Sequence, residues 1–123
     1  MKLDSVIRCK NDIESVGDVI ENKIIETIDV NVIGHFGNAV SLEIFCKSVA
    51  PMSGHSNTQN IGYIIRAIIE LLDLSGDNGI RLSEIKNIPC RVVYDRQYRC
   101  IGIGHFMKDR FVYIKDLLKI DEQ

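Results

Sequence analysis

The stretch "KIIETIDVNVIG" (residues 23–34) decides the fold, because it carries the clearest β pattern in the chain. β-branched apolar residues alternate here with polar ones, which is typical of a strand that lies with one face on a core. The alternation predicts that one face holds Ile24, Glu26, Ile28, Val30 and Val32. It predicts that the other face holds Ile25, Thr27, Asp29 and Asn31.

The next stretch, "GNAVSLEIFCKS" (residues 37–48), repeats the alternation and predicts a second strand. Gly34, Gly37 and Asn38 lie between the two runs, and glycine and asparagine readily adopt the positive φ of a tight turn. We therefore expect a hairpin with the first copy of "IGHF" at its turn. Its second strand should present one apolar face, which consists of Val40, Leu42, Ile44 and Cys46.

The middle of the chain predicts a loop and then a helix. Residues 49–60, "VAPMSGHSNTQN", are polar and read as a loop, and residues 57–74, "NTQNIGYIIRAIIELLDL", read as one long helix with Asn57 or Thr58 as its cap. Arg66 and Glu70 should form an i,i+4 pair. The apolar face of this helix would consist of Ile61, Ile64, Ile65, Ile68, Leu71 and Leu72.

The C-terminal part predicts a second hairpin, formed by residues 90–95 and 98–106, with its turn near Arg96 and Gln97. Residues 109–120 fit a strand, a helix, or one followed by the other. The fold class that follows is α+β: an antiparallel sheet of two hairpins with one long apolar helix packed across it. We expect residues 1–123 to form one domain.

Composition places the chain among ordinary globular proteins, with 46% hydrophobic and 26% charged residues. The charge is unevenly distributed: residues 1–80 have a net charge of −5 and residues 81–119 a net charge of +5. Such asymmetry can indicate an anionic partner for the C-terminal half. Complementarity between the two halves of the same molecule explains it equally simply, and we favour that interpretation.

The four cysteines contain no Cys-x-x-Cys pair and no zinc-finger spacing. Neither a signal-peptide pattern nor an apolar run of membrane-spanning length is present. We therefore expect a cytoplasmic protein with free thiols, no membrane partner and no cofactor. Cys46 and Cys90 lie in apolar stretches and should be buried as small hydrophobic residues.

All three histidines follow a glycine, and "IGHF" occurs twice, at residues 33–36 and 103–106. Three histidines can bind zinc, but no two of them have the spacing of a local metal site. We predict that they share no ligand sphere. His35 should lie at a hairpin turn, His55 in a mobile loop, and His105 near a sheet edge beside Lys108 and Asp109.

The stretch "DLSGDNGIRLSE" (residues 73–84) resembles an EF-hand calcium loop. Asp73, Ser75, Asp77 and Glu84 stand at the ligand positions of that motif, although Asn78 replaces its usual glycine. Pro89 leaves little room for an exiting helix. A helix end followed by an Asp-Asn-Gly turn explains residues 73–84 as well as a calcium loop does. The sequence therefore does not decide whether this stretch binds a metal ion.

Basic and aromatic residues interleave between positions 91 and 113, as in proteins that stack bases and hold phosphates. The cations are Arg91, Arg96, Arg99, Lys108 and Arg110. The aromatic residues are Tyr94, Tyr98, Phe106, Phe111 and Tyr113. Because aromatic side chains in strands are commonly part of a core, nucleic-acid binding is an alternative here rather than the leading hypothesis.

Three stretches, "IGYIIRAIIELLDL", "IKNIPCRVVYD" and "IGIGHFMKDRF", resemble a group of small phage and prophage proteins without an assigned activity. The third stretch is the most specific, with an Ile-Gly-His-x-x-Lys-Asp-(Lys/Arg)-(Trp/Phe) block. Asn87 and Phe111 stand where the group has glycine and tryptophan. The resemblance implies a phage-type accessory protein, and it transfers no catalytic residue.

We therefore expect the protein to bind a host or viral macromolecule rather than to catalyse a reaction. A component of host defence is one such partner. The residues expected to bind are His105, Lys108, Asp109, Arg110, Arg91, Arg96 and Arg99. The alternatives are a nucleic-acid-binding hairpin, a metal site at residues 73–84, and a histidine-based enzyme. Sequence leaves the identity of the partner and the oligomeric state open, and a homo-oligomer is compatible with it.

Overall fold

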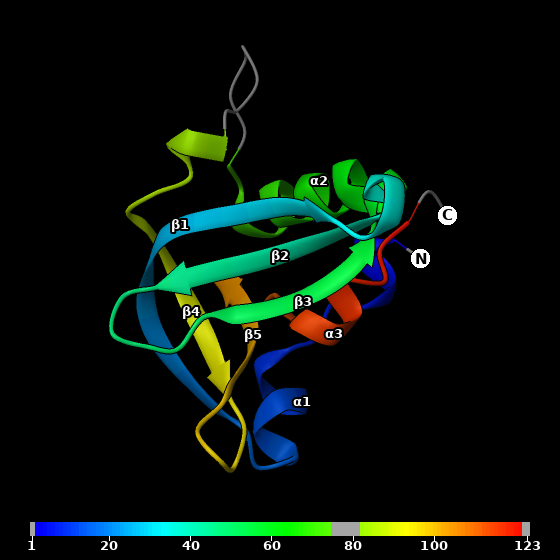
Figure 1. The fold of residues 1–123 in the computed structure, drawn as a ribbon. Coiled ribbons are helices and arrows are strands. Elements are labelled where there is room, and N and C mark those ends of the chain that lie inside the picture. Colours follow the sequence, from blue (N-terminus) through cyan, green and yellow to red (C-terminus); the bar gives the residue numbers. More distant parts are fainter. Residues whose placement is uncertain (1, 75–81, 122–123) are drawn as a thin grey trace.

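The sheet is built around β1 (Val19–Ile33), which is long enough to pair with different neighbours along its length. A computed structural model describes residues 2–74 and 82–121. Within these residues the strands form one antiparallel sheet in the order β3-β2-β1-β4-β5-β6, curled into a half-barrel (Figure 1). The other strands are β2 (Ala39–Cys46), β3 (Met52–Asn57), β4 (Ile88–Tyr94), β5 (Cys100–His105) and β6 (Phe111–Tyr113).

Each half of β1 has its own partner. Residues Val19–Ile25 pair with β4, and residues Ile25–Ile33 pair with β2. The register with β2 shifts between Ile25 and Thr27, so Glu26 is an extra residue in the strand. An extra residue of this kind bends a strand and increases its twist, and the bend at Glu26 lies where the sheet changes from one set of neighbours to the other.

The bulge also changes which side chains face the core, and one sequence prediction is wrong for that reason. Ile24 is 42% exposed, whereas Ile25 is fully buried and Ile28 is buried beside it in the core. Ile24 and Ile28 therefore do not share a face, because the alternation is interrupted between them. On β2 the prediction is confirmed, and the buried side chains are Val40, Leu42, Ile44 and Cys46.

The long helix predicted from the sequence is α2 (Ile61–Leu72), and a 3₁₀ turn at Thr58–Asn60 leads into it. Its buried side chains pack with those of the sheet in one core, so the α+β architecture is confirmed. The side-chain cap expected at its start is absent, since the Thr58 hydroxyl donates instead to the Gly37 carbonyl. Arg66 and Glu70 form the expected pair at 3.3 Å.

β3 was predicted as part of a polar loop, and this prediction is wrong. The strand pairs in regular register with β2, from Ala39 opposite Asn57 to Ile44 opposite Met52. A Cβ atom at Gly54 would overlap the end of the Leu118 side chain, which packs against the strand there. Gly54 and Asn57 are of residue types that are depleted in strands, so the segment gives little local β signal.

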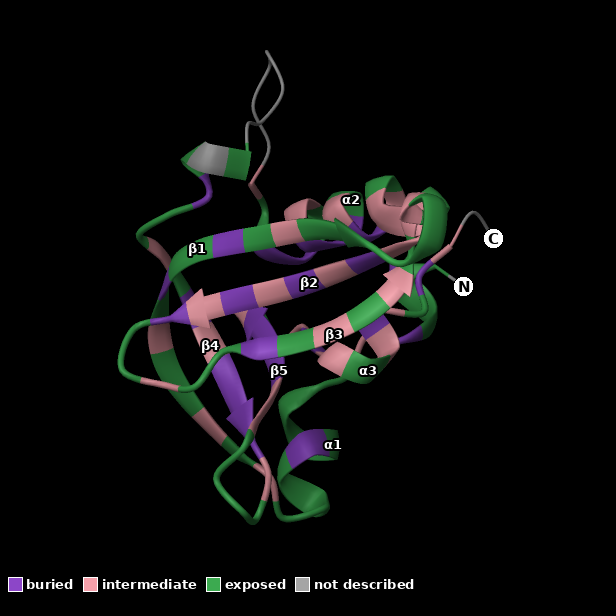
Figure 2. Ribbon diagram, in the orientation of Figure 1, coloured by how far each residue is buried: buried purple, intermediate pink, exposed green. Residues whose placement is uncertain are grey.

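The sheet carries a core on each face (Figure 2). The main core lies between the inner face and α2, and includes Cys46 and Cys90, which are buried as predicted. A smaller cluster on the other face consists of Ile13, Val93 and Phe111, and α1 (Lys10–Ser15) covers it. The C-terminal segment is a strand followed by a helix, β6 and then α3 (Ile114–Leu117).

Gly104, in the second copy of "IGHF", allows a contact across three strands. Arg91 in β4 and Phe111 in β6 are both in register with Gly104, which lies between them in β5. The Arg91 guanidinium lies over the Phe111 ring, 4.5 Å from its centroid. A Cβ atom at Gly104 would overlap the ring, so glycine at this position is explained by close packing.

We predict that Gly104→Ala lowers the free energy of unfolding by ~1–3 kcal/mol, because the added methyl group must displace a fully buried ring. The matched control is Gly62→Ala in α2, where an added Cβ would meet nothing within 4 Å. That control should raise stability by up to ~1 kcal/mol, since alanine favours helix over glycine. Denaturant unfolding measures both, and equal effects of the two substitutions would contradict the packing role of Gly104.

Candidate functional site

His105, at the end of β5, faces the C-terminal end of α2. Its Nε2 lies 3.2 Å from the carboxylate of Asp73, which directly follows α2 in the left-handed conformation. Its Nδ1 accepts hydrogen bonds from the backbone N–H groups of Met107 and Lys108, at 3.0 and 2.9 Å. This arrangement requires the neutral ring with its proton on Nε2. Burial lowers the pKa of His105, and the Asp73 carboxylate opposes that shift.

Asp73 is the centre of this group, because three cationic or hydrogen-bonding side chains converge on its carboxylate. Lys108 Nζ and Arg110 Nη2 both donate to it, the latter at 3.0 Å. These two bonds lower the pKa of Asp73 to about 2. Arg110 also donates to the carbonyls of Glu70 and Leu71 in the last turn of α2. We call Asp73, His105, Lys108 and Arg110 the Asp73 cluster.

Two neighbouring residues extend the cluster to the rest of the fold. Arg91 donates from Nε to the His105 carbonyl at 2.8 Å and from Nη2 to the Lys108 carbonyl at 2.6 Å. Asp109 accepts from the backbone N–H of Lys10, the first residue of α1, at 2.6 Å. The loop after β5 is thereby tied to both α1 and α2.

The structure thus brings together five of the seven residues predicted to bind: Arg91, His105, Lys108, Asp109 and Arg110. The other two, Arg96 and Arg99, lie at the opposite end of the β4–β5 hairpin. There Arg99 pairs with Asp95 at 2.8 Å, and Arg96 donates to the Val16 carbonyl at 3.2 Å. The basic hairpin expected from the sequence is therefore divided between two separate places.

The pairing of His105 with Asp73 resembles the acid–base pairs of enzymes, but its geometry suits a structural role. A general base needs a free nitrogen lone pair within reach of a substrate. In His105 that lone pair, on Nδ1, already accepts two backbone N–H groups. The cluster holds an acidic residue of the first half of the chain against basic residues of the second, as internal charge complementarity predicts.

The three histidines do not converge. His35 lies in the 3₁₀ turn His35–Gly37 of the first hairpin, as predicted, whereas His55 lies in β3 rather than in a mobile loop. Among the described residues no group of three or more His, Cys, Asp or Glu side chains could hold a metal ion. Of the calcium-like stretch, residues 75–81 lie outside the described residues, and Asp73 contacts cationic side chains.

The aromatic residues expected to stack on nucleic acid are mostly used inside the fold. Phe111 and Tyr94 are buried, and the Tyr113 hydroxyl donates to Asp18 at 2.8 Å. Tyr98 is different, because it is 86% exposed at the turn between β4 and β5. Phe106, at 43% exposure, follows β5.

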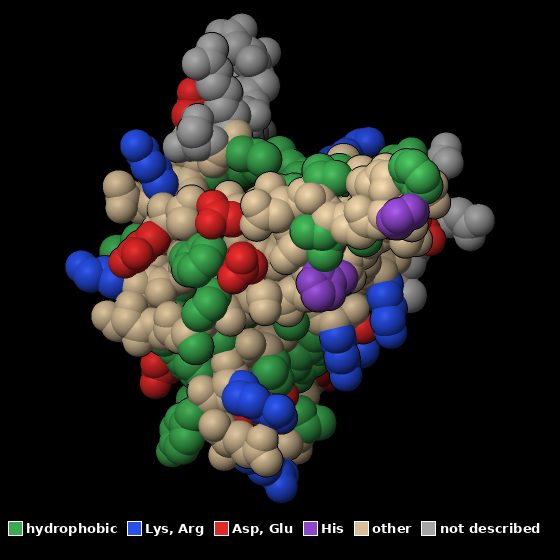
Figure 3. Space-filling model, in the orientation of Figure 1, with side chains coloured by type: hydrophobic (Ala, Val, Ile, Leu, Met, Phe, Trp, Pro, Cys, Tyr) green, Lys and Arg blue, Asp and Glu red, His purple; other side chains and the backbone are tan. Residues whose placement is uncertain are grey.

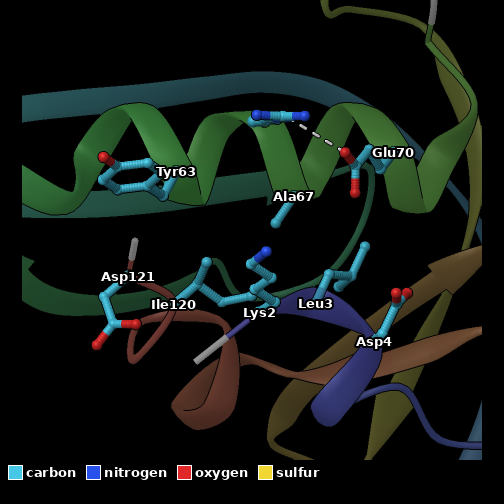
Figure 4. A pocket seen from close by; sticks show the side chains of 9 residues that line it. Lys2, Leu3, Asp4, Tyr63, Ala67, Glu70, Ile120 and Asp121 are labelled. Carbon is cyan, nitrogen blue, oxygen red and sulfur yellow. Dashed lines mark hydrogen bonds and ion pairs between the residues drawn. The ribbon is translucent and has the colours of Figure 1, made fainter. Parts of the chain in front are cut away.

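Hollows on the surface show no concentration of one kind of charge. One of about 270 Å³ lies between α2 and the two chain ends (Figure 4), where Arg66 is engaged with Glu70. Another, of about 520 Å³, lies beside α1 and β6, and there Asp18 accepts from Tyr113. Each combines lysine or arginine with aspartate, so neither indicates a ligand of defined charge.

A different surface, which the sequence did not single out, lies where β1 runs past the end of β4. From Thr27 to Ile33, β1 pairs with β2 on one side. On its other side it makes no backbone hydrogen bond within the described part of the chain. Val32 is 64% exposed although its partner in β2, Val40, is buried.

Phe36 continues this surface at the tip of the first hairpin. Its side chain is 97% exposed, and its φ of 59° places a bulky residue in the left-handed region. The ring of His35 meets the Phe36 ring edge-on, with centroids 4.5 Å apart. We name the free edge Thr27–Ile33 together with Phe36 the β1-edge surface.

Comparison of the chain with protein-family models, curated proteins and solved structures finds no significant match to any of them. Among the described helices, none combines the length and the apolar character that crossing a membrane requires.

The Asp73 cluster predicts a specific pH dependence. In the folded protein the pKa of Asp73 is about 2, below the ordinary value near 3.9. The ionised carboxylate therefore stabilises the fold above pH ~4, and this stabilisation is lost as the pH falls through about 2. Asp73→Asn should therefore lower the melting temperature most at neutral pH. The difference from the unmodified protein should shrink steadily between pH 4 and pH 2, because other titrating groups cancel in the comparison. A difference that stays constant over this range would contradict the role of Asp73.

Proposed function

We propose that this chain is a small accessory protein of the phage type, which acts by binding a host or viral protein at the β1-edge surface. A component of host defence belongs to this class of partner. The proposal combines the resemblance of the "IGIGHFMKDRF" stretch with an exposed strand edge that has no partner strand among the described residues.

The observation that carries the proposal is that Phe36, exposed and in a strained conformation, adjoins the unpaired edge of β1. Tyr98 has similar exposure and the same φ, but it follows β4, which is paired on both sides. A non-glycine residue in the left-handed region costs on the order of 1 kcal/mol or more, and such strain is found preferentially at functional sites. The Phe36 ring is also left almost wholly in water, where an aromatic side chain gains nothing for the fold. Aromatic side chains, phenylalanine included, are enriched at the cores of protein interfaces.

The predicted binding residues of the Asp73 cluster support the proposal in another way. Their charged groups are directed toward one another and toward the end of α2, so the cluster fixes the frame of the molecule. A partner would therefore meet the first hairpin rather than this cluster. The β1-edge surface has the unpaired backbone and exposed apolar side chains that recognition of another protein uses.

We predict that Phe36→Asn abolishes partner binding without loss of stability. Asparagine tolerates the left-handed conformation, so the free energy of unfolding should stay within ~0.5 kcal/mol or rise. The measurement is gel filtration of the protein with host lysate, followed by affinity capture and quantification of stoichiometric partners. The variant should retain less than about a tenth of the captured partner, as for the loss of an interface anchor.

Tyr98→Asn is the matched control, because Tyr98 is also an exposed aromatic residue with a φ of 59° at a hairpin tip. It should capture as much protein partner as the unmodified chain does. The same variant tests the nucleic-acid alternative, since Tyr98 stands between Arg96 and Arg99. Salt-dependent binding of oligonucleotides that Tyr98→Asn removes would favour that alternative. Capture of no stoichiometric protein, or equal capture with Phe36→Asn, would overturn the proposed function.

A further inference from the structure

We propose that the partner contributes an extended, basic segment, which adds to the sheet as a new strand beside Thr27–Ile33. This inference rests on the proposed function and names the chemistry of the partner at the same surface. Free edges of sheets bind extended segments through main-chain hydrogen bonds, and the alternation of side chains then determines specificity.

The backbone of the edge is suited to a further strand. The register between β1 and β2 is regular from Thr27 to Ile33, so this part of the edge contains no further bulge. Sheet edges are commonly protected by charged side chains, lysine above all, by proline or by a bulge. Residues 27–33 contain no proline and no lysine, and Asp29 is their one charged residue.

The inner face of the edge favours apolar side chains on an added strand. Val30 and Val32 lie opposite Leu42 and Val40, which are buried. Val30 packs against the main core, but Val32 at 64% exposure lies at its margin. An apolar side chain on a new strand beside Val32 would remove that surface from water.

The outer face of the edge favours cationic side chains on an added strand. Asp29 lies directly opposite Glu43 across the β1–β2 pair. Two like charges in directly opposite positions repel each other and destabilise the strand pair. Neither carboxylate forms an ion pair within the part of the chain that the structure describes. Acidic side chains gather over β1 and β2 on this face (Figure 3). Lysine or arginine in the neighbouring strand would offset this repulsion.

A second copy of the chain is a poorer occupant of the edge. Pairing two β1 strands would place the Asp29 and Glu43 carboxylates of both copies on one continuous face and increase the repulsion. A segment in which basic and apolar residues alternate satisfies both faces at once. The occupant is therefore a strand of a different protein.

The test is a titration of the whole ¹⁵N-labelled protein with acetylated, amidated peptides as long as Thr27–Ile33. One peptide alternates Lys with Val, one alternates Glu with Val, and one carries the Lys and Val residues in two blocks. The alternating Lys–Val peptide should bind at least about tenfold more tightly than the others at low salt, with amide shifts at residues 27–33. Its advantage over the Glu–Val peptide should diminish as salt is raised.

Two variants locate the binding. Val32→Lys places an inward-facing charge on the edge, and Asp29→Lys reverses the charge on its outer face; each should weaken the Lys–Val peptide at least about tenfold. Val19→Lys is the matched control, because Val19 is 49% exposed in the same strand but lies in its other half, where the edge that faces β4 is already paired. It should leave the binding unchanged.

Equal binding of the three peptides, shifts outside residues 27–33, or no binding would overturn the inference. A dimer of the protein alone that Val32→Lys dissociates would also overturn it and make a second copy the occupant. If the peptides fail while partner capture still depends on Phe36, the proposed function stands and the basic strand does not. If capture is independent of Phe36, the proposed function fails whatever the peptides do.

Discussion

The shape of the molecule depends on one constraint: β1 serves two sets of neighbours on its opposite edges, over different halves of its length. The bulge at Glu26 is where the change occurs, and the bend there lets β2 and β3 turn away from β4, β5 and β6. The inner face can then enclose the apolar side of α2. The same arrangement leaves the second half of β1 with a partner on one side, which creates the β1-edge surface.

A second interaction fixes the helix within this frame. α2 ends at Leu72, and its last carbonyls need donors that the helix cannot supply. Arg110 donates to two of them, the carbonyls of Glu70 and Leu71. Asp73 accepts from His105, the last residue of β5, and from Lys108 in the loop that follows. The two copies of "IGHF" thus have different physical roles. In the second, glycine admits the Phe111 ring and histidine binds Asp73; in the first, the His35 ring lies against the exposed Phe36 ring.

Sequence predicted those parts of the fold that local pattern controls, and failed where a distant contact decides. The faces of β2 and α2 follow from periodicity, and the first hairpin turn follows from Gly34, Gly37 and Asn38. The second hairpin follows from the two strand-like runs on either side of Arg96 and Gln97. The bulge at Glu26 carries no local signal, and β3 contains few of the residue types that favour strands. The Asp73 cluster was predicted in part, since its basic block stood out, but Asp73 itself was interpreted only as part of a helix end or as a calcium ligand. Phe36 between two glycines was the one available signal for the β1-edge surface.

Amide hydrogen exchange of the free protein, measured residue by residue by NMR, tests the central claim most directly. In an antiparallel pair with a free edge, alternate N–H groups point away from the neighbour and toward solvent. The account predicts slow exchange throughout Cys90–Val93, where β4 lies between β1 and β5, and an alternation of slow and fast exchange from Thr27 to Ile33. Uniformly slow exchange across Thr27–Ile33 would show that this edge is already covered, and would contradict the account.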